Sequence, residues 1–143
     1  MRVEEIMSTD VEIISPDATA EDARNRMHLR GIHHLIVEEN NEIVGVVSDR
    51  DLGGPRRVAD LKGKIVRDVM AQSVATIKPE NSLRDAANLF RGRSIGCLPV
   101  VHNKKAIGII TVTDLLDLIG RGSKALPRGV EFVTQARQPG RGR

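Results

Sequence analysis

Two stretches of this chain are near copies of each other: residues 45–52 read GVVSDRDL and residues 108–115 read GIITVTDL. Each stretch holds a glycine, two β-branched residues, a hydroxyl residue and, three positions after the hydroxyl, an aspartate. The two stretches lie 63 positions apart along the chain. Similarity at a fixed period indicates a fold built from copies of one structural unit.

The repetition extends far beyond these eight residues. A shift of 63 positions aligns residues 3–52 with residues 66–115 without a gap, and sixteen of the fifty pairs are identical. Each copy predicts a strand, a helix, two strands joined by a tight turn, and a closing helix that begins in the quoted stretch. A copy of this size buries too little surface to fold alone, so we expect the copies to pack together. The predicted class is α+β, with two β-α-β-β-α repeats about a pseudo-two-fold axis.

Local signals set the expected element positions. Strands are expected over residues 12–14, 34–37 and 43–47 in the first copy, and over 75–77, 98–101 and 107–110 in the second. Thr19 and Ser82 have the spacing of helix N-caps. The predicted organisation is a first repeat over residues 1–56, a linker over 57–64, a second repeat over 65–120 and a flexible basic tail over 121–143.

Composition limits the class of function. Hydrophobic residues make up 40% and charged residues 29% of the chain, as in an ordinary globular protein. With two Phe and no Tyr or Trp, the chain lacks the aromatic platform on which proteins stack single-stranded nucleic acid. One cysteine allows no internal disulfide, and neither a secretory signal nor a membrane-spanning run follows Met1. We therefore expect a cytoplasmic protein without a membrane partner.

The basic tail opens one alternative. Residues 121–143 carry six basic residues and one acidic residue, so the excess positive charge of the chain belongs to this segment. Basic side chains can bind phosphates of nucleic acid in a salt-dependent way. Association with nucleic acid through the tail is therefore the alternative function, and a solvated terminus is the simpler interpretation.

The hydroxyl and the aspartate in each quoted stretch have two interpretations. Ser48 with Asp51, and Thr111 with Asp114, have the spacing of a capping box at a helix start. Each pair also follows an apolar strand directly, and ligands collect at the carboxyl ends of strands and at helix N-termini. A carboxylate at this place can accept two hydrogen bonds from a vicinal diol such as ribose. The pattern is therefore compatible with a cap and with a nucleoside site.

The duplicated unit resembles a known family. A proline follows the first strand in both copies, the strands GIHHLIV and SIGCLPVV occupy equivalent places, and each copy ends in G-h-h-S/T-x-x-D, where h is apolar. This combination is similar to a pair of CBS domains, also called a Bateman module. The resemblance implies a regulatory module that binds AMP, ADP, ATP or S-adenosylmethionine in clefts between the repeats. It also implies a homodimer. Because a ligand in a shared cleft would contact both repeats, we expect it to act on an effector protein through a change of conformation or assembly.

The resemblance also implies the residues of two clefts, each drawing on both repeats. Asp51 or Asp114 would hold the ribose, the nearby hydroxyl residues would meet ribose or phosphate, and apolar residues would flank the base. A guanidinium at Arg50 favours a phosphorylated ligand on that side, whereas His33 and His34 are bulky enough to narrow or block the other. Cleft A comprises Val46, Ser48, Arg50, Asp51, Met70, Ile95 and Gly96, and cleft B comprises Met7, Ile32, His33, Ile109, Thr111, Thr113 and Asp114.

Two more specific functions, metal binding and catalysis, are less well supported by the sequence. His33, His34 and Cys97 suggest a zinc site, but only His28 and His102 remain as further imidazole donors, at unrelated positions. Catalysis needs a nucleophile with a base, or paired carboxylates, in one cleft, and no such set or phosphate-binding loop is apparent. We therefore expect no bound metal, no catalytic residues and no enzymatic activity, with the adenosyl ligand acting only as a regulator.

Overall fold

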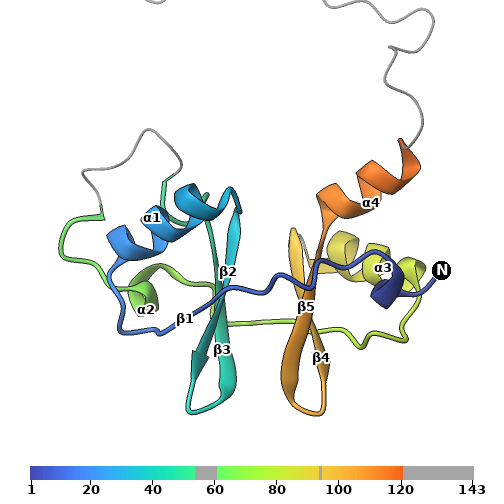
Figure 1. Cartoon of the computed structure of the whole chain (residues 1–143), viewed down its shortest axis with the longest axis horizontal. Coiled ribbons are helices and arrows are strands. Elements are labelled where there is room, and N and C mark those ends of the chain that lie inside the picture. The colour runs from blue at the N-terminus through green and yellow to red at the C-terminus, as the bar shows by residue number, and fades with distance from the viewer. Residues whose placement is uncertain (54–60, 94, 121–143) are drawn as a thin grey trace, which may run out of the picture.

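The computed structural model describes residues 1–53, 61–93 and 95–120 of the chain, as two α+β halves that lie side by side (Figure 1). The predicted α+β class with two repeats is confirmed. The basic tail, with the function predicted for it, and residues 57–60 of the predicted linker lie outside the described residues. Among the helices that are described, none has the length and apolar character needed to cross a membrane.

The two halves have the same hairpin and the same preceding helix. In the first half β1 (Ile13–Ile14), α1 (Ala20–Arg30), β2 (His34–Glu39) and β3 (Glu42–Ser48) form a sheet of order β1-β2-β3 with the helix beside it. In the second half α3 (Leu83–Arg93) precedes the antiparallel pair β4 (Cys97–His102) and β5 (Lys105–Thr111), and α4 (Val112–Ile119) follows. The strand predicted over 75–77 is present only as a parallel bridge between Ile77 and Val100.

The turns and caps follow their local sequence signals. Asn40 and Asn41 both have positive φ, and Asn103 and Lys104 have the same geometry in the second hairpin. Two consecutive residues of this kind make the turn whose twist matches that of the flanking strands. The predicted cap at Thr19 is confirmed, because its hydroxyl accepts a hydrogen bond from the backbone of α1, and the Ser82 hydroxyl does the same for α3.

The two halves exchange their first turns. The N-terminal 3-10 turn η1 (Val3–Glu5) packs in the second half, where the backbone N–H of Val3 donates to the carbonyl of Asn81 (2.8 Å). The short helix α2 (Val66–Val69) packs in the first half, where the N–H of Val66 donates to the carbonyl of Ala18 (2.8 Å). Figure 1 shows the chain starting beside α3 and crossing to β1. Each half is therefore completed by a turn of the other copy.

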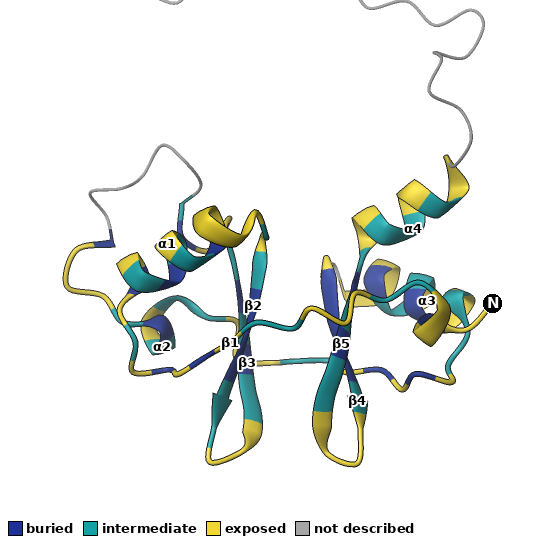
Figure 2. Ribbon diagram, viewed as in Figure 1, coloured by how far each residue is buried: buried dark blue, intermediate teal, exposed yellow. Residues whose placement is uncertain are grey.

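Each buried core contains a valine from the exchanged turn of the other copy. Val3 and Val66 are fully buried, and burial of a valine side chain contributes roughly 2 kcal/mol. Figure 2 shows the buried residues concentrated in the two hairpins and on the inner sides of α1 and α3. The first core contains Ile14, Ala20, Ala23, Met27, Leu35, Val37, Val47, Leu52, Leu61 and Val66, and the second contains Val3, Ile77, Ala86, Phe90, Leu98, Val100 and Ile110.

Within the described residues, a closing helix follows the hairpin in the second copy but not in the first. Thr111 caps α4, but the residues that follow β3 form turns, with the N–H of Leu52 bonded to the carbonyl of Asp49 and that of Gly53 to that of Arg50. The helix predicted at this place is wrong for the described residues. Gly53 has a φ of +80°, which ends helical geometry, and Gly54 and Pro55 come directly after it.

Two glycines allow the exchanged segments to approach the hairpins. A Cβ on Gly45 of β3 would lie 2.5 Å from Sδ of Met70 and 2.9 Å from the carbonyl oxygen of Ala71. A Cβ on Gly108 of β5 would lie 2.6 Å from Sδ of Met7 and 2.9 Å from the carbonyl oxygen of Ser8. The methionine could move aside, but the backbone oxygen is held by paired hydrogen bonds to the next strand residue. A glycine is therefore required at each position, because the exchanged segment lies too close to the strand for a side chain.

We predict that Gly45→Ala and Gly108→Ala each destabilise the protein by about 1–3 kcal/mol, because the added methyl group forces the exchanged backbone away from the strand. Chemical denaturation followed by circular dichroism measures the change. Gly92→Ala is the matched control, because nothing lies within 4 Å of its added Cβ in α3. This control should be neutral or stabilising. Equal effects at all three glycines would contradict the close-contact explanation.

Candidate functional site

Cleft A is a cavity of about 440 Å³ between the repeats. The end of β3 and the turn after it supply Ser48, Arg50 and Asp51, and Gly96 with Cys97 comes from the entry to β4 in the other repeat. Six of the seven residues expected in this cleft line the cavity, and Met70 does not. The full lining is His34, Val46, Ser48, Asp49, Arg50, Asp51, Ala71, Ser73, Val74, Ala75, Ile95, Gly96, Cys97, Thr111, Val112 and Thr113.

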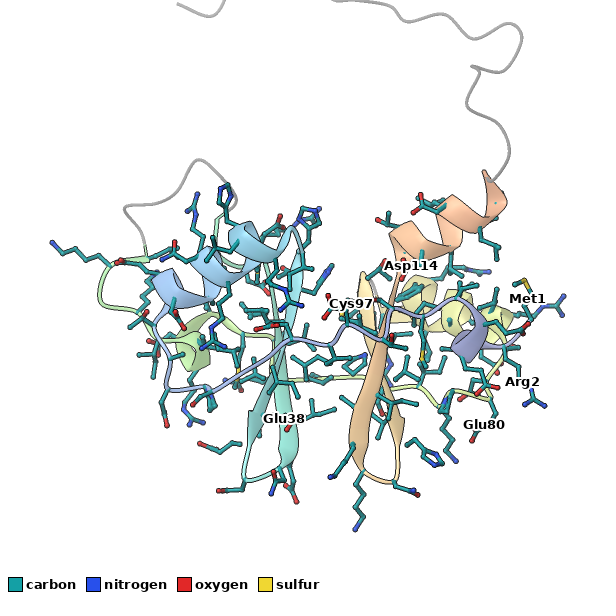
Figure 3. All side chains as sticks on the ribbon, viewed as in Figure 1. Met1, Arg2, Glu38, Glu80, Cys97 and Asp114 are labelled. Atoms are coloured by element: carbon teal, nitrogen blue, oxygen red, sulfur yellow. The ribbon has the colours of Figure 1, made fainter. Side chains whose placement is uncertain are left out.

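Cleft B is the equivalent cavity, of about 320 Å³. The start of α4 supplies Thr113 and Asp114, and the segment before β2 supplies Ile32 and His33. Figure 3 shows Asp114 at the start of α4. Six of the seven expected residues line this cavity, and Met7 does not. The full lining is Ser8, Asp10, Val11, Glu12, Ile32, His33, His34, Ile36, Ile109, Thr111, Thr113 and Asp114.

Met7 and Met70 do not line the clefts, because their side chains pack over glycines of the hairpins. Their sulfur atoms lie over Gly108 and Gly45, where they fill the space that a side chain on the glycine would take. Met70 packs against the first core and Met7 against the second. Both methionines thus belong to the contact between the exchanged segments and the hairpins.

The two aspartates form the bonds of a capping box and also line the clefts. The N–H of Ser48 donates to Oδ2 of Asp51 (2.8 Å), and the Ser48 hydroxyl accepts from the N–H of Asp51 (3.1 Å). The same pair of bonds joins Thr111 and Asp114, at 2.8 and 3.1 Å. Each carboxylate is fixed by one of its oxygens, and a carboxylate has further lone pairs available for donors. The capping geometry therefore orients a carboxylate that also lines a cleft.

The segments that connect the exchanged turns to the first strands also line the clefts. Residues 8–12 contribute to cleft B and residues 71–75 to cleft A. The family resemblance implied that residues just after Met7 and Met70 lie beside the base, but it did not name them individually. The alignment of the two copies at a shift of 63 positions marks these segments as equivalent, because Val11 and Val74 are an identical pair. Their position at a cleft depends on the exchange of the first turns, since each segment runs from one half to the other (Figure 1).

The clefts share part of their wall. His34, Thr111 and Thr113 line both cavities. Burial lowers the pKa of the His34 imidazole below its usual value, although the charge of Asp49 acts in the opposite direction. The neighbouring His33 is exposed, and its Nδ1 lies 2.9 Å from Oδ2 of Asp49. Neither histidine closes its cleft, because both clefts remain open cavities in their presence.

Cys97 lies at the start of β4, close to Asp114 (Figure 3). Burial raises the pKa of its thiol to about 12, so this sulfur stays protonated near neutral pH. A protonated thiol is a poor nucleophile and a poor metal ligand. In the part of the chain that the structure covers, no three His, Cys, Asp or Glu residues are grouped so as to hold a metal ion.

A third cavity, of about 370 Å³, lies along α1. Its lining includes Arg24, Met27 and Leu52, on the side where a closing helix was expected in the first copy. The buried Nη1 of Arg24 has no hydrogen-bond partner among the described residues. This cavity contains neither of the repeated aspartates, although it shares Ile32 and His33 with cleft B and Asp49 with cleft A.

Comparison with known proteins identifies the family. The sequence model of the CBS domain matches residues 3–52 and 66–121, and the chain belongs to this family. It is 30% identical over 138 residues to a CBS domain-containing protein of Dictyostelium discoideum, covering 87% of this chain and 95% of the relative. Among solved structures it is similar to CBSX2 in complex with AMP, with a TM-score of 0.69 and 28% identity over 82% of this chain and 95% of that one.

Some relatives are longer proteins with enzymatic names. The chain is 34% identical over 119 residues to the homoserine O-acetyltransferase of Methanobrevibacter ruminantium. That match covers 82% of this chain but 24% of the relative. The CBS pair is therefore one part of that enzyme, and the similarity assigns no acetyltransferase activity to this chain.

The lowered pKa of His34 predicts a pH-dependent stability. The folded state keeps the imidazole neutral at pH values where the unfolded chain, with a pKa near 6.5, takes up a proton. The unfolded state then binds more protons, so the free energy of unfolding falls as pH decreases below that value. We predict that His34→Gln reduces the loss of stability between about pH 7 and about pH 5.5.

Urea denaturation at a series of pH values measures this effect. His102→Gln is the matched control, because it removes an imidazole from the exposed end of β4. The prediction is wrong if the two variants have the same pH profile.

Proposed function

We propose that this protein is a regulatory module that binds adenosine-bearing ligands in clefts A and B. The observation that carries the proposal is the composition of the two cavities. Each combines the hydroxyl and aspartate that end one hairpin with the apolar start of the hairpin in the other repeat. A ligand in either cleft contacts both repeats at once.

The side chains of each cleft match the parts of a nucleoside. The carboxylate of Asp51 or Asp114 has lone pairs for the two hydroxyls of a ribose, and it is already oriented by a backbone N–H. Val46 with Ile95, and Ile109 with Ile32, give apolar surfaces for the two faces of a purine. The AMP bound by the similar CBSX2 supports this class of ligand. AMP, ADP, ATP and S-adenosylmethionine are the candidates.

Regulation follows from the position of the clefts. A ligand that contacts both repeats stabilises the relative placement that fits it, and an effector protein that prefers this placement then responds to ligand concentration. The chemistry of the lining residues supports binding rather than turnover, because the hydroxyl and carboxylate of each motif are already bonded to backbone groups. We propose that the protein controls an effector and does not itself catalyse a reaction.

We further propose that the module works as a homodimer joined through α4. Val112, Leu116 and Ile119 are exposed by 36%, 62% and 81%, and their spacing places them on one side of this helix. Figure 2 shows α4 projecting outward from the end of β5, with exposed residues along its length. Apolar helix faces of this kind commonly mark protein contacts, and a second copy offers the same face in return.

We predict that AMP or S-adenosylmethionine raises the melting temperature in a concentration-dependent way, corresponding to about 2.7 kcal/mol at a hundred times Kd. Asp51→Ala and Asp114→Ala should each remove binding at their own cleft. Differential scanning fluorimetry and calorimetric stoichiometry measure these effects. Asp85→Ala is the matched control, since Asp85 forms the same capping bonds with Ser82 but lines neither cleft.

The control separates capping from ligand binding. Asp85→Ala should lower stability by about 1 kcal/mol and leave the ligand-induced shift unchanged. If AMP, ADP, ATP and S-adenosylmethionine all leave the melting temperature of the wild-type protein unchanged, the proposed function is wrong.

We predict that Leu116→Gln lowers the dimer fraction at micromolar concentration, because it places an amide in the centre of the apolar face of α4. Light scattering coupled to gel filtration measures the mass. Asp117→Gln, at a neighbouring exposed position of the same helix, is the control and should leave the mass unchanged. A monomeric wild-type protein would contradict the proposed dimer.

A further inference from the structure

The two clefts are built from equivalent positions of the repeat, but the charges at these positions differ. Asp10 and Glu12 line cleft B. The positions 63 residues later hold Ser73 and Ala75, which line cleft A. Two carboxylates on one side of the molecule thus correspond to a hydroxyl and a methyl group on the other.

The second difference lies within the repeated motif. Arg50 lines cleft A, whereas Thr113 holds the equivalent place in cleft B. Asp49 also lines cleft A, but its carboxylate is bound by His33 at 2.9 Å. No lysine or arginine is found among the described residues that line cleft B. The guanidinium is therefore confined to one of the two clefts.

One arginine outside cleft B offsets part of its charge. Arg30 of α1 lies 2.6 Å from Oδ1 of Asp10 and 3.4 Å from Oε2 of Glu12. These carboxylates raise the pKa of the Arg30 guanidinium, and Asp10 has the larger effect. A single cation faces two carboxylates, and Asp114 adds a third negative group to the lining. The Glu12 side chain is only 22% exposed, so solvent screens its charge less than that of Asp10, which is 66% exposed.

We propose that the clefts select ligands by charge: cleft A takes phosphorylated adenosine compounds, and cleft B takes adenosine derivatives without phosphate, either uncharged or cationic. This inference rests on the proposed function and assigns a ligand class to each cleft. The specificity-determining residues are Arg50 in cleft A and Asp10 with Glu12 in cleft B. The shared wall of His34, Thr111 and Thr113 serves both clefts and so does not discriminate between them.

The proposed selectivity follows from the different electrostatic field that a phosphate group meets in each cleft. In cleft A a phosphate can pair with the guanidinium of Arg50 through two hydrogen bonds. In cleft B the same phosphate would approach three carboxylates, and Arg30 balances the charge of only one of them. The remaining negative charge in a partly buried site repels the phosphate. Loss of the phosphate removes both effects but leaves the ribose and the base unchanged.

Adenosine and AMP form a matched pair of probes, because they differ only in the phosphate. Isothermal titration calorimetry on Asp51→Ala measures cleft B, and the same titration on Asp114→Ala measures cleft A. Asp51→Ala should bind adenosine at least about tenfold more tightly than AMP, and Asp114→Ala should show the opposite preference.

A second set of variants tests the assigned residues. Asp10→Asn with Glu12→Gln, added to Asp51→Ala, should raise AMP affinity by about tenfold and leave adenosine affinity within about twofold. Glu42→Gln with Glu80→Gln in the same background is the matched control. It changes net charge by the same amount at exposed positions that line neither cleft, and should not alter the preference.

The outcomes separate this inference from the proposed function. Binding of AMP to Asp51→Ala as tightly as adenosine overturns the charge selection and leaves the proposed function intact. An equal gain in AMP affinity in the control variant also overturns it, because the effect would then come from net charge. If neither compound binds the wild-type protein or any variant, both the inference and the proposed function are wrong.

Discussion

The close contact between each exchanged segment and a glycine of the opposite hairpin is the constraint on which the rest of the structure depends. Backbone carbonyls of Ser8 and Ala71 meet Gly108 and Gly45 so closely that a Cβ at either glycine would lie only 2.9 Å from the carbonyl oxygen. This contact fixes where the chain crosses from one half to the other. The crossing segments become a wall of each cleft, so the geometry of both sites is set by packing at a distance from any ligand.

The duplication gives the two clefts the same backbone construction, but their lining side chains differ in charge. The capping bonds of Asp51 and Asp114 have the same lengths in both copies, which preserves the group expected to hold a ribose. The positions around this group have changed charge, as Arg50 and Glu12 show. A symmetric scaffold with unequal charges is therefore compatible with two classes of ligand. The two clefts are adjacent, since His34 lines both.

The sequence predicted those features that depend on local or periodic signals. The repeat, the asparagine turns and the caps at Thr19 and Ser82 each need only a few neighbouring residues. The exchange of first turns could not be predicted, because a shift of the sequence against itself is the same whichever half Val3 and Val66 enter. The closing helix of the first copy was predicted wrongly because Gly53 takes a positive φ. The family resemblance implied that residues just after Met7 lie at a cleft, but the contribution of the Asp10 and Glu12 carboxylates was not predicted, because it depends on the path of the crossing segment.

Hydrogen–deuterium exchange with and without an adenosine ligand tests the central claim most directly, because it reports each segment separately. A ligand in cleft B should protect residues 8–12, 32–34 and 109–114 together, and a ligand in cleft A should protect residues 46–51, 71–75 and 95–97. Each set contains segments from both halves of the chain. Protection confined to one repeat, or to the outer faces of α1 and α3, would contradict ligand binding between the repeats.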